Sequence, residues 1–262
     1  MALPTIDTDR ENPHTLLRSF YTVPRVGQER LSDGGGPFGF DITTALQVDF
    51  LIGAYACDGV VETGCFLGDT TDYLSRMYAD LPVRTCDIDP RSAGFTRQRL
   101  RRRDNVEVYQ GDSGDLMPTL LAGLERPLVY LDAHWNTRWP LQDELIAVGT
   151  GIVAVDDFNI GHPSFGYDHY DGVDCGPELI AQALPDIDEL FVGNPYAGYP
   201  LPCLQTGRRS GTGYVARSLA PTAMARSQMF HRVPVRPNVM MPPWDIHEGD
   251  LRRGPVPNGA SA

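Results

Sequence analysis

The 262-residue sequence contains no lysine, and all 22 of its basic residues are arginines. A catalytic lysine is therefore excluded. Basic residues are also too few to balance the 34 acidic ones, which leaves a formal net charge of −12. Because nucleic acids and anionic membranes attract basic surfaces, this charge argues against either of them as a partner.

Paired cysteines and long apolar runs are missing as well. The five cysteines are scattered and form no C-x-x-C pair, which is typical of reduced thiols and argues against a disulfide framework or a zinc site. Residues 1–12 are polar and lack the apolar core of a signal peptide, and no apolar run is long enough to cross a bilayer. We therefore expect a cytoplasmic protein.

Three zones follow one another along the chain. Residues 1–40 are polar and rich in turns, and we expect them to form a cap or lid. Residues 41–218 alternate short β-rich runs with helical stretches and are predicted to form the main domain. Residues 219–262 are rich in proline and arginine, show little periodicity and are predicted to be an irregular tail.

The main zone contains seven candidate strands, at 59–62, 84–87, 106–110, 128–131, 152–155, 189–192 and 213–216. Helical stretches are predicted at 41–57, 69–79, 91–102, 114–122, 141–148 and 177–184. This alternation predicts an α/β fold with a doubly wound, mostly parallel, seven-stranded sheet and helices on both faces. Ligands bind at the carboxyl ends of the strands in such a sheet, so the residues after each strand are the candidates for chemistry.

A turn with two glycines, Glu62-Thr63-Gly64-Cys65-Phe66-Leu67-Gly68, follows the first predicted strand. Gly64 and Gly68 allow a sharp turn, which a tight connection without any ligand would also explain. Glu62 stands where a dinucleotide site has its first glycine, and a carboxylate there would repel a pyrophosphate. S-adenosylmethionine has no phosphate and carries an ammonium and a sulfonium, so Glu62 favours that ligand.

The second and third predicted strands also end in polar residues. Asp87 is expected to accept hydrogen bonds from a ribose diol, and Asp89 to cap the next helix. Asp112 or Ser113 would hydrogen-bond an adenine edge or, alternatively, cap the helix that follows. As a series, these polar strand ends favour a nucleoside ligand.

Carboxylates follow the fourth and fifth predicted strands: Asp132 after one, Asp156 and Asp157 after the other. Neighbouring parallel strands would bring the three together, where they repel each other unless a cation neutralises them. Mg²⁺ or another divalent cation binds such oxygen ligands. His134, two residues beyond Asp132, is a candidate base for a hydroxyl of the substrate.

Together, these motifs resemble those of class I S-adenosylmethionine-dependent methyltransferases over residues 41–160. The resemblance is to metal-dependent O-methyltransferases of the catechol O-methyltransferase type and to bacterial natural-product sugar O-methyltransferases. It implies a Rossmann-like fold and methylation of a small-molecule hydroxyl. It assigns the metal site to Asp132, Asp156 and Asp157, and the donor site to Glu62, Gly64, Phe66, Gly68, Thr70, Asp87, Asp112, Ser113 and Asp132.

The resemblance has one clear departure. Catechol enzymes place a lysine base three residues beyond the first metal-binding aspartate, where this chain has Trp135. The sugar enzymes place their base two residues beyond it, which favours His134 and an acceptor of the natural-product or sugar type. Residues 20–40 and the loop at 159–176 are expected near the acceptor, with His162, Tyr167, His169 and Tyr170 as candidate contacts in the loop.

Three alternatives stay open. One is a metal-independent N- or C-methyltransferase on the same fold, one is a nucleotide-dependent oxidoreductase, and one is a non-catalytic relative. The expected partner is a small-molecule acceptor, with no nucleic acid and no membrane, and assembly into a homo-oligomer is compatible with the sequence.

Overall fold

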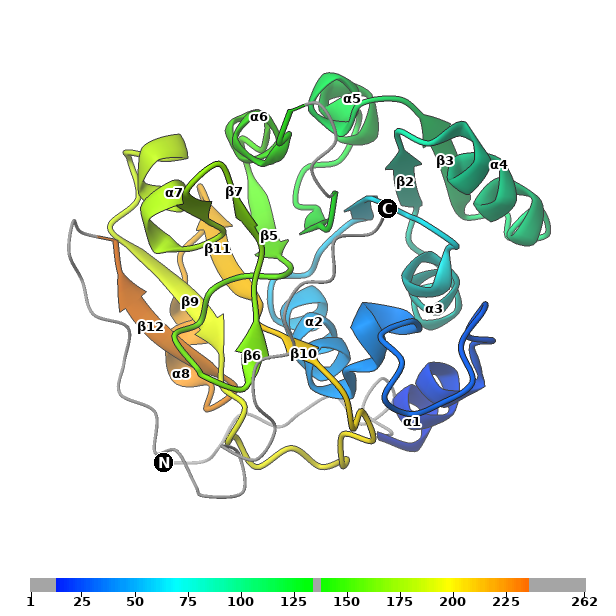
Figure 1. The fold of residues 1–262 in the computed structure, drawn as a ribbon. Helices are drawn as coiled ribbons and strands as arrows, with labels where there is room; N and C mark the ends of the chain where they lie inside the picture. The colour runs from blue at the N-terminus through cyan, green and yellow to red at the C-terminus, as the bar shows by residue number, and fades with distance from the viewer. Residues whose placement is uncertain (1–12, 134–137, 236–262) are drawn as a thin grey trace.

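The structure is a computed structural model that describes residues 13–133 and 138–235 (Figure 1). Its helices are α1 (Pro13–Thr22), the 3-10 helix η1 (Pro37–Phe40), α2 (Ile42–Ala54), α3 (Asp69–Met77), α4 (Pro90–Arg99), α5 (Ser113–Leu120), α6 (Leu141–Ala147), α7 (Pro177–Ala183) and α8 (Thr222–Arg226). Its strands are β1 (Val60–Thr63), β2 (Val83–Asp87), β3 (Val106–Gln110), β4 (Leu128–Leu131), β5 (Gly151–Val155), β6 (Phe165–Gly166), β7 (His169–Tyr170), β8 (Val173–Asp174), β9 (Glu189–Gly193), β10 (Arg209–Ser210), β11 (Gly213–Arg217) and β12 (Phe230–Pro234).

An eight-stranded sheet in the order β12-β9-β11-β5-β4-β1-β2-β3 forms the centre of the described chain. The strands from β3 to β5 pair in parallel. β11 pairs antiparallel with both β5 and β9, and β12 lies antiparallel to β9 at the edge. The predicted α/β fold with a doubly wound, mostly parallel sheet is confirmed, whereas the predicted number of seven strands is wrong.

Helices cover both faces of the sheet (Figure 1). Successive strand residues point to opposite faces, so Val60 packs in the layer with α1, α2, α3 and α8 while Val61 packs in the layer with α5, α6 and α7. The central strands β4 and β5 are buried on both sides, and this is why they are short runs of apolar residues without a polar face.

The strand of the eight-stranded sheet that the prediction lacks is β12, which comes from the segment predicted as an irregular tail. Phe230 and Val233 are buried on opposite faces of this strand. That prediction is therefore wrong for the described residues that form α8 and β12. The domain boundaries at residues 40 and 218 stay predictions.

The N-terminal segment supports and covers one end of the sheet. Phe20 of α1 packs against Tyr73 of α3 and against Phe40. The chain then passes through residues 23–40 into α2, whose first turn is capped by the Asp41 side chain accepting from the Thr43 N–H at 2.9 Å. Within the described ranges, no helix is long and apolar enough to cross a membrane.

Candidate functional site

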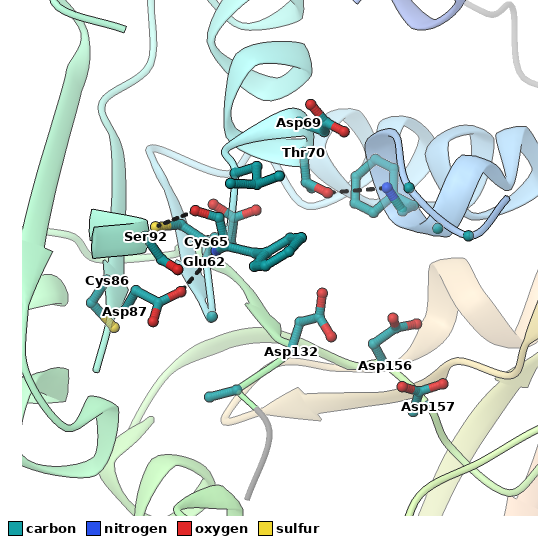
Figure 2. A pocket seen from close by; sticks show the side chains of 18 of the residues that line it. Glu62, Cys65, Asp69, Thr70, Cys86, Asp87, Ser92, Asp132, Asp156 and Asp157 are labelled. Carbon is teal, nitrogen blue, oxygen red and sulfur yellow. Dashed lines mark hydrogen bonds between the residues drawn. The ribbon is translucent and has the colours of Figure 1, made fainter. Parts of the chain in front are cut away.

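A cavity of about 920 Å³ opens at the carboxyl ends of the parallel strands. Its wall is built from residues at the ends of β1, β2, β3, β4 and β5, from several residues between 26 and 39, and from Arg208 and Ser210. Figure 2 shows the labelled side chains at the ends of β1, β2, β4 and β5. This is where an α/β sheet of this kind binds its ligands.

Most of the predicted site residues line this cavity: Glu62, Gly64, Phe66, Thr70, Asp87, Asp112, Ser113, Asp132, Asp156 and Asp157. Gly68 does not line it. Instead, Gly68 precedes α3 in a left-handed conformation, with φ of 73°, and packs against Thr96. His134, the predicted base, lies outside the described residues.

Gly64 is required by the protein's own backbone. Its φ is 78°, and a β-carbon there would overlap the carbonyl oxygen of Asp132. A tight turn thus accounts for this glycine without a ligand. The same turn leaves Phe66 63% exposed at the cavity, also at positive φ.

Glu62 is a buried carboxylate on the wall of the cavity. It accepts hydrogen bonds from the hydroxyls of Thr71 and Thr85, the second at 2.7 Å. Burial raises the pKa of Glu62 to about 7, although the two hydroxyls act in the opposite direction. A cationic ligand group beside Glu62 would restore its charged form.

Asp87 is held in place by two backbone amides. One of its oxygens accepts from the Phe66 N–H at 2.8 Å and the other from the Asp89 N–H at 2.9 Å. Asp89 in turn caps α4 by accepting from the Arg91 N–H, so its predicted capping role is confirmed. The Asp87 carboxylate therefore has a fixed orientation at the cavity wall.

Asp112 and Ser113 lie at the start of α5. Asp112 caps the helix by accepting from the Gly114 N–H at 3.0 Å, and it also forms an ion pair with Arg138. Asp112 therefore caps the helix, and its contact with an adenine stays a prediction. Ser113 is buried and lines the cavity.

The predicted meeting of three carboxylates is present. β4 and β5 are neighbours, with Leu131 opposite Val155, so the residues that follow them converge. Oxygens of Asp132, Asp156 and Asp157 lie within 4.8 Å of one another, and Figure 2 shows them as a group apart from Glu62 and Asp87. Hard divalent cations prefer such oxygen donors, so the chemistry of the cluster fits one.

Two residues of this region, Arg208 and Ser210, were not predicted from the sequence. Arg208 donates to Asp157 at 3.0 Å, and the Ser210 hydroxyl donates to the same oxygen. Both residues come from a segment about fifty positions further along the chain and belong to no recognisable motif. Asp157 itself has a φ of 45°.

Several residues between 26 and 39, within the segment predicted to form a cap or lid, line the cavity. Phe38 and Phe40 both have positive φ, and the Phe38 N–H donates to the Thr70 hydroxyl at 3.0 Å (Figure 2). The Arg25 side chain holds the preceding loop by donating to the carbonyls of Gly35 and Asp33. This segment is thus hydrogen-bonded to the first turn of α3.

The other predicted acceptor contacts do not reach the cavity. His162 is buried and hydrogen-bonded to Tyr196, and His169 pairs with Asp174. Neither they nor Tyr167 and Tyr170 line the cavity.

The chain is similar to an O-methyltransferase, imqG, from Aspergillus flavus, with 27% identity over 92 residues. The match covers 32% of this chain and 37% of that protein, so the chain spans well under half of the length of this curated relative. No family model matches the chain. The match confirms the resemblance to O-methyltransferases that the motifs indicated.

Two solved structures with a similar arrangement are a cofactor-bound protein and an SAH-bound methyltransferase. Rv0187 from MTB, solved with its cofactor, is 20% identical with a TM-score of 0.45, over 79% of this chain and 90% of that one. The SAH-bound methyltransferase PaMTH1 of Podospora anserina is 14% identical with a TM-score of 0.43, over 83% of this chain and 98% of that one.

Proposed function

We propose that this chain is an S-adenosylmethionine-dependent O-methyltransferase that methylates a hydroxyl of a small molecule with the help of a divalent cation. The observation that carries the proposal is a single cavity with two separate groups of carboxylates. Glu62 and Asp87 lie in one part of its wall, and the carboxylate cluster of Asp132, Asp156 and Asp157 in another. Its volume of about 920 Å³ is within the range of small-molecule sites.

The donor would lie along the ends of β1, β2 and β3. Glu62 is the partner for the ammonium of the methionine moiety, because a buried carboxylate gains most from a neighbouring cation. Asp87 would hold the ribose hydroxyls and Ser113 the adenine. A dinucleotide would instead place its pyrophosphate next to Glu62, which speaks against an oxidoreductase.

The acceptor would lie at the carboxylate cluster. Asp132, Asp156 and Asp157 would hold Mg²⁺ or a similar cation, whose positive charge lowers the pKa of a nearby hydroxyl. His134 is the proposed base, on the basis of its place two residues after Asp132. The cavity would hold the acceptor oxygen in line with the sulfonium methyl, and excluding water there would favour transfer over hydrolysis.

The cluster favours this reading over a metal-independent N- or C-methyltransferase, because such chemistry has no use for three converging carboxylates. The net charge of −12 favours a small-molecule acceptor over a nucleic acid or a membrane. A natural-product or sugar hydroxyl is the acceptor class that the position of His134 supports.

The first test is calorimetric titration with S-adenosylhomocysteine and with NAD. Binding of the first alone is expected, and binding of NAD alone would overturn the proposal. Methyl transfer is then measured with a panel of hydroxylated natural products and sugars. Activity should disappear in EDTA and return with Mg²⁺. Full activity in the chelator would show that the reaction needs no cation, whereas the proposed methyltransferase activity would stand.

A variant tests the cluster directly. Asp156→Ala should abolish transfer and leave the binding of S-adenosylhomocysteine unchanged. Asp186→Ala is the matched control, since Asp186 lies away from the cavity and pairs with Arg217. A fully active Asp156→Ala variant would show that the cluster has no catalytic function.

A further inference from the structure

Arg208 is fixed in its place by the small strand that follows it. β10 pairs in parallel with β6, with Arg209 opposite Phe165 and Ser210 opposite Gly166. A β-carbon on Gly166 would overlap the guanidinium of Arg208, so this side chain lies directly against the main chain of β6. Gly166 thus makes room for Arg208.

The next residue anchors the same segment to the body of the protein. The Arg209 guanidinium donates to the Asp41 carboxylate at 2.6 Å and to the Thr43 hydroxyl at 2.9 Å. It also lies over the Phe165 ring, 4.6 Å from the centroid. The Asp41 and Arg209 side chains are 5% and 15% exposed, so the pair is largely shielded from solvent and salt. Arg208 is therefore presented to the cavity by a firmly held segment.

Asp157 meets two donors through one oxygen. Arg208 Nη2 lies 3.0 Å from Asp157 Oδ1, and the Ser210 hydroxyl donates to that same Oδ1. The Asp157 side chain is 13% exposed. Its backbone is in the left-handed region, with φ of 45°. One of the three carboxylates in the cluster therefore already has a positive partner within the protein.

We propose that Arg208 is a built-in counter-ion of the carboxylate cluster, which restrains Asp157 and lowers the affinity of the cluster for divalent cations. This inference rests on the cation site of the proposed function. The cation would then be held chiefly by Asp132 and Asp156. Arg208 is a positioning residue here, because it acts through Asp157.

The physical basis is competition between two positive charges for one carboxylate. Without a cation, the guanidinium offsets part of the repulsion among the carboxylates. With a cation, the same guanidinium repels it across a distance too short for screening by salt. Removing the positive charge should therefore tighten cation binding, whereas a merely structural role of Arg208 predicts weaker or unchanged binding.

The experiment measures Mn²⁺ binding to the full chain by calorimetry and by electron paramagnetic resonance. Arg208→Gln should bind Mn²⁺ about tenfold more tightly than wild type, in line with the loss of a nearby like charge. Arg208→Lys, which keeps the charge, should bind within about threefold of wild type. Arg138→Gln is the matched control, because Arg138 also lines the cavity but pairs with Asp112 at the start of α5.

A double variant keeps the test valid if Arg208→Gln does not fold. Arg208→Gln/Asp157→Asn removes both charges of the pair and leaves no unpaired carboxylate at position 157. Its Mn²⁺ affinity should stay within about threefold of wild type, since the other two carboxylates are unchanged. A loss of binding in this variant would show that Asp157 is an essential ligand and would overturn the inference.

The outcomes separate the inference from the proposed function. If wild type binds Mn²⁺ and Arg208→Gln binds it less tightly or equally, the inference is wrong and the cation site stands. If wild type binds none and Arg208→Gln binds it, the counter-ion role is supported and the cation dependence of the function is wrong. If neither wild type nor Arg208→Gln binds Mn²⁺, both the counter-ion inference and the cation dependence of the function are wrong. Binding of S-adenosylhomocysteine in the same samples still tests the proposed donor site.

Discussion

Gly64 lies directly against the main chain of Asp132, so that a β-carbon on Gly64 would overlap the Asp132 carbonyl oxygen. The contact joins the turn after β1 to the first carboxylate of the cluster. Two neighbouring strands, with Thr63 opposite Leu131, bring these segments together. The proposed donor and acceptor parts of the cavity thus share a backbone contact that admits no side chain.

The Gly64→Ala variant should be strongly destabilised and should lose the donor site. The positive φ of 78° alone costs an alanine about 1–2 kcal/mol, and the overlap with Asp132 adds to it. Chemical denaturation followed by circular dichroism gives the loss of stability, and calorimetry gives the affinity for S-adenosylhomocysteine.

Gly123 provides the control for backbone strain alone. Its φ is 76°, but a β-carbon there would meet nothing within 4 Å. Gly123→Ala should therefore be destabilised only by the cost of the positive φ, and it should keep the full affinity for S-adenosylhomocysteine. Equal losses in the two variants would show that the contact with Asp132 is unimportant.

The strands and helices of the main domain were predictable because they are buried or amphipathic and short. β4, for example, is the apolar run Leu128–Leu131, and its observed bounds are the predicted ones. β12 was not predictable, because an edge strand needs fewer apolar residues and Phe230–Pro234 contains a histidine, an arginine and a proline. Its pairing with β9 comes from tertiary contacts alone.

The site was predictable where it depends on the sheet. Polar residues after neighbouring strands must meet at one edge, which is how Asp132, Asp156 and Asp157 were placed together. Arg208 and Ser210 could not be predicted, because they arrive from an irregular segment whose path depends on the packing of β10 against β6. The spacing of residues along the sequence does not indicate the contact of Arg208 and Ser210 with Asp157.

Asp87→Ala should weaken binding of S-adenosylhomocysteine by about tenfold to a hundredfold, the usual cost of losing hydrogen bonds to a charged group. The variant removes the acceptor for the Phe66 N–H and the proposed acceptor for the ribose hydroxyls. Asp89→Asn is the control, because asparagine also caps a helix. Unchanged binding by Asp87→Ala in calorimetry would contradict the ribose assignment.

Thr70→Val should loosen the cover over the cavity. The valine cannot accept the hydrogen bond from the Phe38 N–H, which is buried, and leaving such a donor unsatisfied costs about 1–3 kcal/mol. Hydrogen exchange at the backbone amides of residues 38–40 should become faster, and Thr70→Ser should exchange like wild type. Slow exchange in Thr70→Val would mean that this bond does not hold the cover.

The affinity for S-adenosylhomocysteine should rise between pH 6 and pH 8. Burial raises the pKa of Glu62 to about 7, so the carboxylate that would face the ligand's ammonium forms over this interval. Glu62→Gln should lower the affinity at pH 8 more than at pH 6, since glutamine carries no charge at either pH. Parallel pH profiles of the two proteins would show that Glu62 does not contact the ammonium.

Glu144 should make the ligand-free protein less stable as the pH rises. It is fully buried, and neither of its carboxylate oxygens has a hydrogen-bond partner of normal geometry among the described residues. Burial raises its pKa from 4.5 to about 7, against the lowering effect of the Ser113 and Thr63 hydroxyls. Between about pH 4.5 and pH 7, Glu144 therefore keeps a proton in the folded protein that it has lost in the unfolded chain.

Stability contributed by that proton is therefore full below about pH 4.5 and is lost as the pH rises to about 7, a change of roughly 3 kcal/mol at most. In Glu144→Gln, the free energy of unfolding should fall less over this interval than in wild type. Glu178→Gln, at an exposed position of α7, should behave like wild type. Denaturant titrations at pH 5, 6, 7 and 8 give the free energy of unfolding of each protein. If it changes with pH equally in Glu144→Gln and in wild type, Glu144 is already ionised in the folded protein at low pH.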